Sequence, residues 1–259
     1  MIQMQMTLRS TILEMDTKIN VLLPEDRHKT VDTRGKKYPV LYILHGMKED
    51  CSSWLNLSNI FLLCRDLELI VVMPSANNSS YVDQVYGMNY FTYITEELPT
   101  KLKNYLPISD DPDQTFIMGE SMGGYGTMRC ALGAPEKYGK AVCLSAGNIA
   151  THPIKHRIME LALGNDQEAI MKSDNNLYNL MERLSKSEGH IPDFKVYCGT
   201  DDFVYEGCVE LCEKLKDTLP EHFKGAEFSE GEHNFFFWNK VLPKALEFFG
   251  FEVKQDSVV

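Results

Sequence analysis

A serine flanked by glycines is the feature of this chain with the clearest chemical meaning. Residues 119–124 read Gly-Glu-Ser-Met-Gly-Gly and match Gly-x-Ser-x-Gly, with Ser121 at the centre. In this pattern a sharp turn from strand to helix lifts the serine hydroxyl above a sheet edge, and glycines avoid collisions there. The apolar run 115–118 before it is typical of a buried strand, and helical spacing follows it. We therefore predict that Ser121 is a nucleophile.

The nucleophile needs a base to remove its proton and a third group to orient that base. In proteins with this strand-to-helix turn, called a nucleophile elbow, the catalytic residues follow along the chain in the order serine, then aspartate or glutamate, then histidine. His233 follows the last predicted strand, and Asp201 and Asp202 follow the strand before it. We favour Asp202 as the orienting group, with Asp201 as the alternative, because Asp201 could instead cap the following loop or helix. We expect surface or packing roles for the remaining histidines, which are His28, His45, His152, His156, His190 and His222.

Acyl transfer at a serine also requires two N–H donors for the oxygen that becomes negative. One would be the backbone N–H of Met122, directly after the nucleophile. The other would come from the loop after strand 38–44, where we assign the Met47 N–H, with Gly46 as the alternative. Three aromatic residues are candidates to line an acyl or alcohol pocket, although aromatics at such positions are equally often core: Trp54, Phe203 and Phe235.

Apolar runs alternate with helical patterns along most of the chain. Alternation of this kind predicts right-handed parallel crossovers and a mostly parallel sheet with helices on both faces, an α/β fold. We predict strands at 11–13 and 18–23 (an antiparallel edge pair), 38–44, 69–73, 115–118, 141–144, 194–198 and 226–229. We predict helices at 54–66, 91–105, 123–133, 206–218 and 239–249. Residues 1–259 are expected to form one domain, in which the long polar stretch 151–190 is a cap-like insertion.

Composition narrows the classes of partner and compartment. A formal charge of −11 argues against a nucleic-acid partner. The sequence has no run of about 18 apolar residues, so we expect no membrane span. The N-terminus lacks the pattern of a signal peptide, and the 7 cysteines are scattered without a Cys-x-x-Cys pair. We therefore expect a cytoplasmic protein with a small-molecule substrate and no metal or cofactor. An uncovered strand at the N-terminal edge could pair with a second copy, giving a homo-oligomer.

These motifs together resemble the α/β-hydrolases of the putative-esterase family. That family groups tributyrin esterases, feruloyl and acetyl-xylan esterases, and S-formylglutathione hydrolases. The resemblance is carried by Tyr42-Ile43-Leu44-His45-Gly46-Met47, Ser53-Trp54, Gly119-Glu120-Ser121-Met122-Gly123-Gly124-Tyr125-Gly126, Cys198-Gly199-Thr200-Asp201-Asp202-Phe203 and Gly231-Glu232-His233-Asn234. The Ser-Trp pair together with Gly-Thr-Asp-Asp-Phe is most similar to the small bacterial tributyrin-esterase branch.

The resemblance implies Ser121 as nucleophile, Asp202 as orienting group and His233 as base, with oxyanion donors at Met47 and Met122. The activity it implies is hydrolysis of short-chain acyl esters by a serine carboxylesterase. Feruloyl or acetyl-xylan-type esters and S-formylglutathione are alternative substrates. An acyltransferase that uses the same serine is the alternative class.

Overall fold

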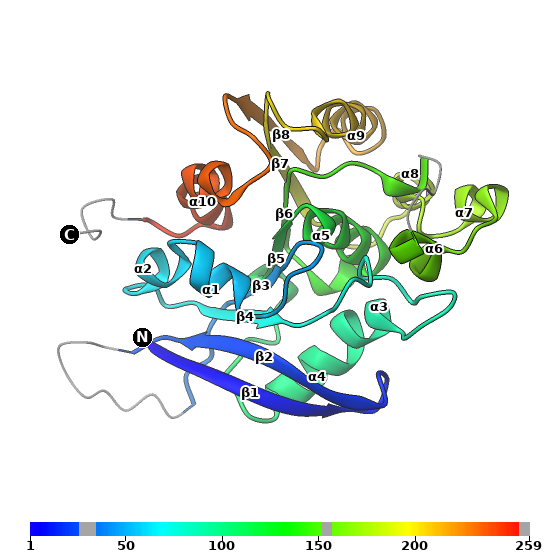
Figure 1. Cartoon of the computed structure of the whole chain (residues 1–259). Coiled ribbons are helices and arrows are strands. Elements are labelled where there is room, and N and C mark those ends of the chain that lie inside the picture. The colour runs from blue at the N-terminus through cyan, green and yellow to red at the C-terminus, as the bar shows by residue number, and fades with distance from the viewer. Residues whose placement is uncertain (26–34, 152–156, 254–259) are drawn as a thin grey trace.

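Among the described residues, eight strands form one sheet through the centre of the molecule (Figure 1). The computed structural model describes residues 1–25, 35–151 and 157–253. The strand order is β1-β2-β4-β3-β5-β6-β7-β8. The first two strands form an antiparallel hairpin that pairs antiparallel with β4, and every other pair is parallel. The strands are β1 (Ile2–Ser10), β2 (Met15–Leu23), β3 (Val40–Leu44), β4 (Ile70–Pro74), β5 (Thr115–Glu120), β6 (Lys140–Leu144), β7 (Asp193–Gly199) and β8 (Phe223–Ser229).

Helices cover both faces of this sheet (Figure 1). One face carries α1 (Ser53–Leu57), α2 (Ile60–Cys64) and α10 (Phe235–Phe249). The other face carries α3 (Tyr90–Thr92), the π-helical turn η1 (Tyr93–Glu97), α4 (Leu98–Lys103), α5 (Met122–Gly133), α8 (Leu177–Leu184) and α9 (Tyr205–Thr218). Short 3₁₀ turns occur at η2 (Pro112–Gln114), η3 (Pro135–Lys137) and η4 (Ile149–Thr151). This is the mostly parallel sheet with helices on both faces that the alternating pattern predicts.

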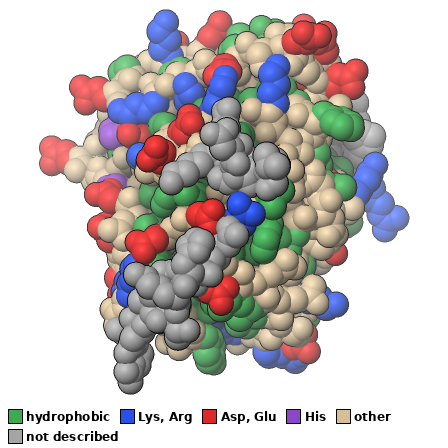
Figure 2. Space-filling model, turned by 90° about the vertical axis from the view of Figure 1, so that its left-hand side faces the viewer, with side chains coloured by type: hydrophobic (Ala, Val, Ile, Leu, Met, Phe, Trp, Pro, Cys, Tyr) green, Lys and Arg blue, Asp and Glu red, His purple; other side chains and the backbone are tan. Residues whose placement is uncertain are grey.

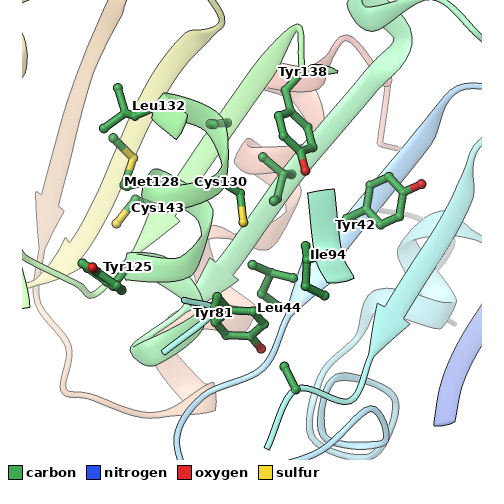
Figure 3. Close-up of a cluster of buried hydrophobic side chains, with 14 of the residues drawn as sticks. Tyr42, Leu44, Tyr81, Ile94, Tyr125, Met128, Cys130, Leu132, Tyr138 and Cys143 are labelled. Atoms are coloured by element: carbon green, nitrogen blue, oxygen red, sulfur yellow. The ribbon is translucent and has the colours of Figure 1, made fainter. Parts of the chain in front are cut away.

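The core has two parts because side chains alternate across a strand. In β3, Leu41 and Ile43 belong to the cluster beneath α10, whereas Tyr42 and Leu44 belong to the cluster beneath α5. Figure 3 shows the second cluster, in which Tyr42 and Leu44 lie near aromatic and sulfur-containing side chains from α5 and its surroundings. Acidic and basic side chains are intermingled on the face that Figure 2 presents.

The predicted strand at 11–13 is wrong. The first strand is β1 (Ile2–Ser10), and residues 11–14 form the turn to β2. The carboxylate of Glu97 holds this turn, because it accepts a hydrogen bond from the Thr11 backbone N–H at 2.7 Å. Local alternation could not reveal that a distant carboxylate fixes a turn at this point. The other predicted strands lie where β2 to β8 are found, within a few residues at their ends.

Two long predicted helices depart from a regular α-helix. Helix 54–66 divides into α1 and α2, where the Ser58 hydroxyl donates to the Trp54 carbonyl oxygen at 2.5 Å and competes with the helical pattern. The predicted helix 91–105 is found as one continuous helical run over residues 90–103, made of α3, η1 and α4, and its middle is π-helical just before Pro99, which has no N–H to continue the ladder. The predicted helices 123–133, 206–218 and 239–249 correspond to α5, α9 and α10.

The segment predicted as a cap-like insertion, 151–190, contains α6 (Arg157–Leu163), α7 (Gln167–Lys172) and α8. The last of these packs against α5 and α9. His28, His152 and His156 lie outside the described residues. A cap role for this segment stays a prediction.

Candidate active site

Ser121 lies at the turn between β5 and α5, with a backbone φ of 55°. The turn brings chain segments so close together that side chains are excluded. A Cβ on Gly123 would lie 2.3 Å from the Leu44 carbonyl oxygen, and one on Gly119 would lie 2.5 Å from the Gly123 oxygen. The positive φ and these contacts are the strained elbow that the motif predicts. The Ser121 hydroxyl is therefore presented above the ends of the parallel strands.

His233 and Asp202 form a hydrogen-bonded chain with this serine. His233 Nε2 lies 2.8 Å from Ser121 Oγ, and its Nδ1 lies 2.9 Å from both carboxylate oxygens of Asp202. Asp202 follows β7, and His233 lies between β8 and α10. Asp201 points elsewhere: its exposed carboxylate accepts from the Thr200 hydroxyl at 3.4 Å. The structure thus brings together the three residues favoured from the sequence.

The surroundings of Asp202 keep its carboxyl ionised. Burial alone would raise its pKa, but hydrogen bonding to His233 and to the Val204 N–H holds the pKa below its ordinary value. The Ser145 hydroxyl acts in the same direction and accepts a hydrogen bond from the Trp238 indole N–H at 3.0 Å. Trp238 also packs edge-on against the His233 ring, with ring centroids 5.3 Å apart.

Ser145 and Trp238 were absent from the sequence-based prediction of the site. A positional signal existed for Ser145, because it follows β6 at the same sheet edge where Ser121 and Asp202 follow their strands. Trp238 carried no such signal, since an aromatic residue in an apolar helix ordinarily indicates core.

The loop after β3 is anchored on several sides, as expected for a segment that must present backbone N–H groups. His45 is buried, and its Nε2 accepts a hydrogen bond from the Ala76 N–H at 2.9 Å. Burial lowers the pKa of His45, in keeping with a neutral ring in this role. The His45 carbonyl oxygen accepts from the Tyr81 hydroxyl at 2.9 Å, and the Lys48 N–H donates to Asn78 at 2.7 Å.

The three predicted pocket residues have different environments. Phe203 is 80% exposed, and its ring centroid lies 4.4 Å from that of His233. Phe235 is half-buried between Trp54 and Trp238. Trp54 is only 1% exposed, and its indole N–H donates to the Leu44 carbonyl oxygen at 3.2 Å, which matches the core role that the sequence left open beside the pocket role. It is a core residue because the polar end of its ring finds a backbone partner inside the fold.

Three further observations concern metal binding, cysteines and membrane spans. Within the described residues, no group of three or more His, Cys, Asp or Glu side chains is arranged to hold a metal ion. All seven cysteines are buried free thiols. None of the helices in the part of the chain described here is long and apolar enough to cross a membrane.

Comparison with known proteins adds to this geometry. The family model described as "Putative esterase" matches residues 10–187. An acetyl esterase of Caldicellulosiruptor saccharolyticus is 30% identical over 94% of this chain and 96% of its own length. The fluorophosphonate-binding serine hydrolase F of Staphylococcus aureus superposes with a TM-score of 0.86, at 26% identity, over 97% of this chain and 99% of that one. The S-formylglutathione hydrolase FrmB of the same organism gives a TM-score of 0.83, at 27% identity, over 96% and 98% of the two chains.

The fold and these similarities define an α/β-hydrolase that acts as a carboxylic ester hydrolase. Within that class, the chain belongs to the putative esterase family.

Proposed function

We propose that this chain is a serine carboxylesterase that hydrolyses short-chain acyl esters through an acyl-enzyme on Ser121. The observation that carries the proposal is the continuous chain from Ser121 Oγ through His233 to Asp202, with contacts of 2.8 and 2.9 Å. These distances suit proton transfer from the serine to the imidazole, and the buried carboxylate orients the ring.

In the first half of the reaction, His233 Nε2 removes the Ser121 proton while Oγ attacks the ester carbonyl carbon. The carbonyl oxygen becomes negative and accepts hydrogen bonds from the backbone N–H groups of Met122 and Met47. The alcohol leaves with the proton that His233 carries. In the second half, His233 takes a proton from water, whose oxygen attacks the acyl carbon, and Ser121 leaves with that proton.

The acyl group is proposed to be short, in the range from acetyl to butyryl. Similarity to an acetyl esterase over nearly the whole of both chains supports this choice. Phe203 beside His233 offers an exposed apolar surface next to the reacting atoms. Thioester hydrolysis is the second candidate, favoured by the similarity to FrmB over nearly the full length of both chains.

A fluorophosphonate probe tests the nucleophile. The wild-type protein should be labelled, and Ser121→Ala should lose both labelling and ester turnover while unfolding at the same temperature as wild type. An unlabelled wild-type protein, or a labelled Ser121→Ala, would contradict the assignment.

A substrate panel tests the acyl preference. We expect kcat/KM to decline with chain length across p-nitrophenyl esters and to exceed the values for methyl ferulate, acetylated xylo-oligosaccharide and S-formylglutathione. A higher value for any of those three would move the assignment to that substrate. Transfer of the acyl group to added alcohol in preference to water would identify an acyltransferase.

A further inference from the structure

A pair of acidic side chains lies beneath the loop that follows β3, directly beside the nucleophile. Glu120 is the last residue of β5 and immediately precedes Ser121, and its side chain is 0% exposed. Glu49 reaches it from the loop. Among the described residues, neither carboxyl oxygen of Glu120 nor the buried Oε2 of Glu49 makes a hydrogen bond of normal geometry. Buried carboxylate oxygens without a donor are costly, so this arrangement needs an explanation.

A shared proton supplies the missing donor. An ionised carboxylate can only accept hydrogen bonds, so two ionised carboxylates that face each other cannot form a hydrogen bond. When one of them is protonated, its O–H can donate to the other. Burial and the negative charge of Glu49 raise the pKa of Glu120 well above its ordinary value, which places the proton on Glu120.

Among the described residues, no cationic group contributes to the pKa shift of Glu120. The other titratable groups around the pair are His45 in the same loop and Tyr81 between β4 and α3, while Lys48 and Asp50 of that loop are exposed. Burial lowers the pKa of His45 and raises that of Tyr81, so both are neutral near neutral pH. The backbone N–H of Gly46 faces the Glu120 carboxyl and favours the ionised form, but its effect is smaller than that of burial and of Glu49.

The Glu120 carboxyl also supports the loop by direct packing. A Cβ on Gly46 would lie 2.5 and 2.7 Å from the two Glu120 oxygens, so the carboxyl group fills the space beneath the Gly46 Cα. The next residue is Met47, the proposed second oxyanion donor. A change in the size or charge of the group beneath Gly46 therefore acts on the backbone that must face the substrate oxygen.

We propose that protonated Glu120, hydrogen-bonded to Glu49, is a positioning residue that holds the Gly46–Met47 backbone ready to bind the oxyanion. The inference rests on the proposed function of Ser121. Loss of the proton would place negative charge under a loop whose task is to stabilise a negative oxygen, and it would remove the hydrogen bond to Glu49. Turnover should therefore fall at alkaline pH as Glu120 ionises.

Three variants separate charge from shape. Glu120→Gln keeps the shape and a donor for Glu49 but cannot ionise, so it should retain most of the turnover and lose the alkaline decline. Glu120→Leu removes the polar group, and kcat should fall about 10- to 100-fold with little change in KM, as when an oxyanion donor is misplaced. In Glu49→Gln the neighbouring charge is gone, so the alkaline decline should move to lower pH. Glu136→Gln, in η3 beyond the far end of the 12-residue α5 and so about 18 Å away along the helix, is the matched control and should behave as wild type.

Infrared spectroscopy tests the proton without relying on catalysis. The wild-type protein at neutral pH should show the C=O stretch of a protonated carboxyl that is missing from Glu120→Gln and present in Glu136→Gln. Absence of that difference would overturn the proposal, and so would alkaline profiles that are identical in wild type and Glu120→Gln. If Glu120→Leu does not fold, Glu120→Gln and Glu49→Gln still decide the outcome. A wild-type protein that turns over no ester would contradict the proposed function, whereas the infrared result would still test the shared proton.

Discussion

Two adjacent aspartates show how much one position matters at the scale of single residues. Asp202 is 5% exposed and contacts His233 with both oxygens, while Asp201 faces solvent beside Thr200. The pKa of Asp202 is lowered in the folded state, so its ionised form stabilises the fold above the pKa of the unfolded chain. That contribution is lost as the pH falls through the folded-state value.

Exchange of each aspartate for asparagine should therefore have unequal effects. Asp202→Asn should lower kcat roughly 10⁴-fold, because the amide no longer selects the tautomer of His233 that accepts the serine proton. Asp201→Asn should change kcat less than about threefold, as expected for an exposed side chain outside the hydrogen-bonded chain. Steady-state kinetics on one p-nitrophenyl ester checks both variants. A comparable loss in the two would remove the distinction between them.

The elbow is the element on which the site depends, and its Gly123 differs from the helical Gly207 in the space around it. Added atoms at Gly123 would meet the backbone of Leu44, which cannot move without displacing β3. Gly207, in α9, is the contrasting case, because its nearest neighbour would be the Gly147 Cα at 3.6 Å, an ordinary contact.

Alanine at these two positions should have opposite effects on stability. Gly123→Ala should lower the free energy of unfolding by about 1–3 kcal/mol through overpacking and should also reduce turnover. Gly207→Ala should raise it by about 0.5–1 kcal/mol, because alanine loses less backbone entropy in a helix. Urea denaturation followed by circular dichroism measures both. A stable, active Gly123→Ala would show that the elbow tolerates a side chain there.

At the scale of the whole molecule, the buried acid beside the nucleophile should affect how stability depends on pH. The folded-state pKa of Glu120 is raised, so the unfolded chain loses this proton at lower pH than the folded one does. Stability is therefore lost as the pH rises from the unfolded to the folded value, by about 1.4 kcal/mol for each pH unit of that interval.

The Glu120→Gln variant cannot ionise at this position, so it should escape that loss. The difference in unfolding free energy between Glu120→Gln and wild type should grow in favour of the variant as the pH rises above the ordinary glutamate range. Denaturation at a series of pH values measures this difference, in which the other titrating groups cancel. Parallel curves for the two proteins would show that Glu120 does not hold its proton in the fold.

Much of the fold and the three residues of the proposed triad could be predicted from local patterns. Apolar runs of strand length mark strands covered on both faces, and the carboxyl ends of parallel strands meet at one edge. The residues directly after β5 and β7, and between β8 and α10, therefore converge, which is why order pointed to Ser121, His233 and the pair Asp201–Asp202, of which Asp202 was favoured.

Contacts between distant segments were decided only in the tertiary structure. Glu97 sets the first turn of the sheet from a helix 85 or more residues away, and Trp54 is a core residue because its indole reaches a strand carbonyl. The proposed pairing of Glu49 with Glu120 also depends on tertiary contacts, since no local pattern in the sequence distinguishes either residue from an ordinary acidic residue. Burial and the approach of a second carboxyl give Glu120 its proton, and these depend on how β3 and β5 pack side by side. Sequence order determined the residues proposed for the chemistry, whereas three-dimensional packing determined the environment in which they act.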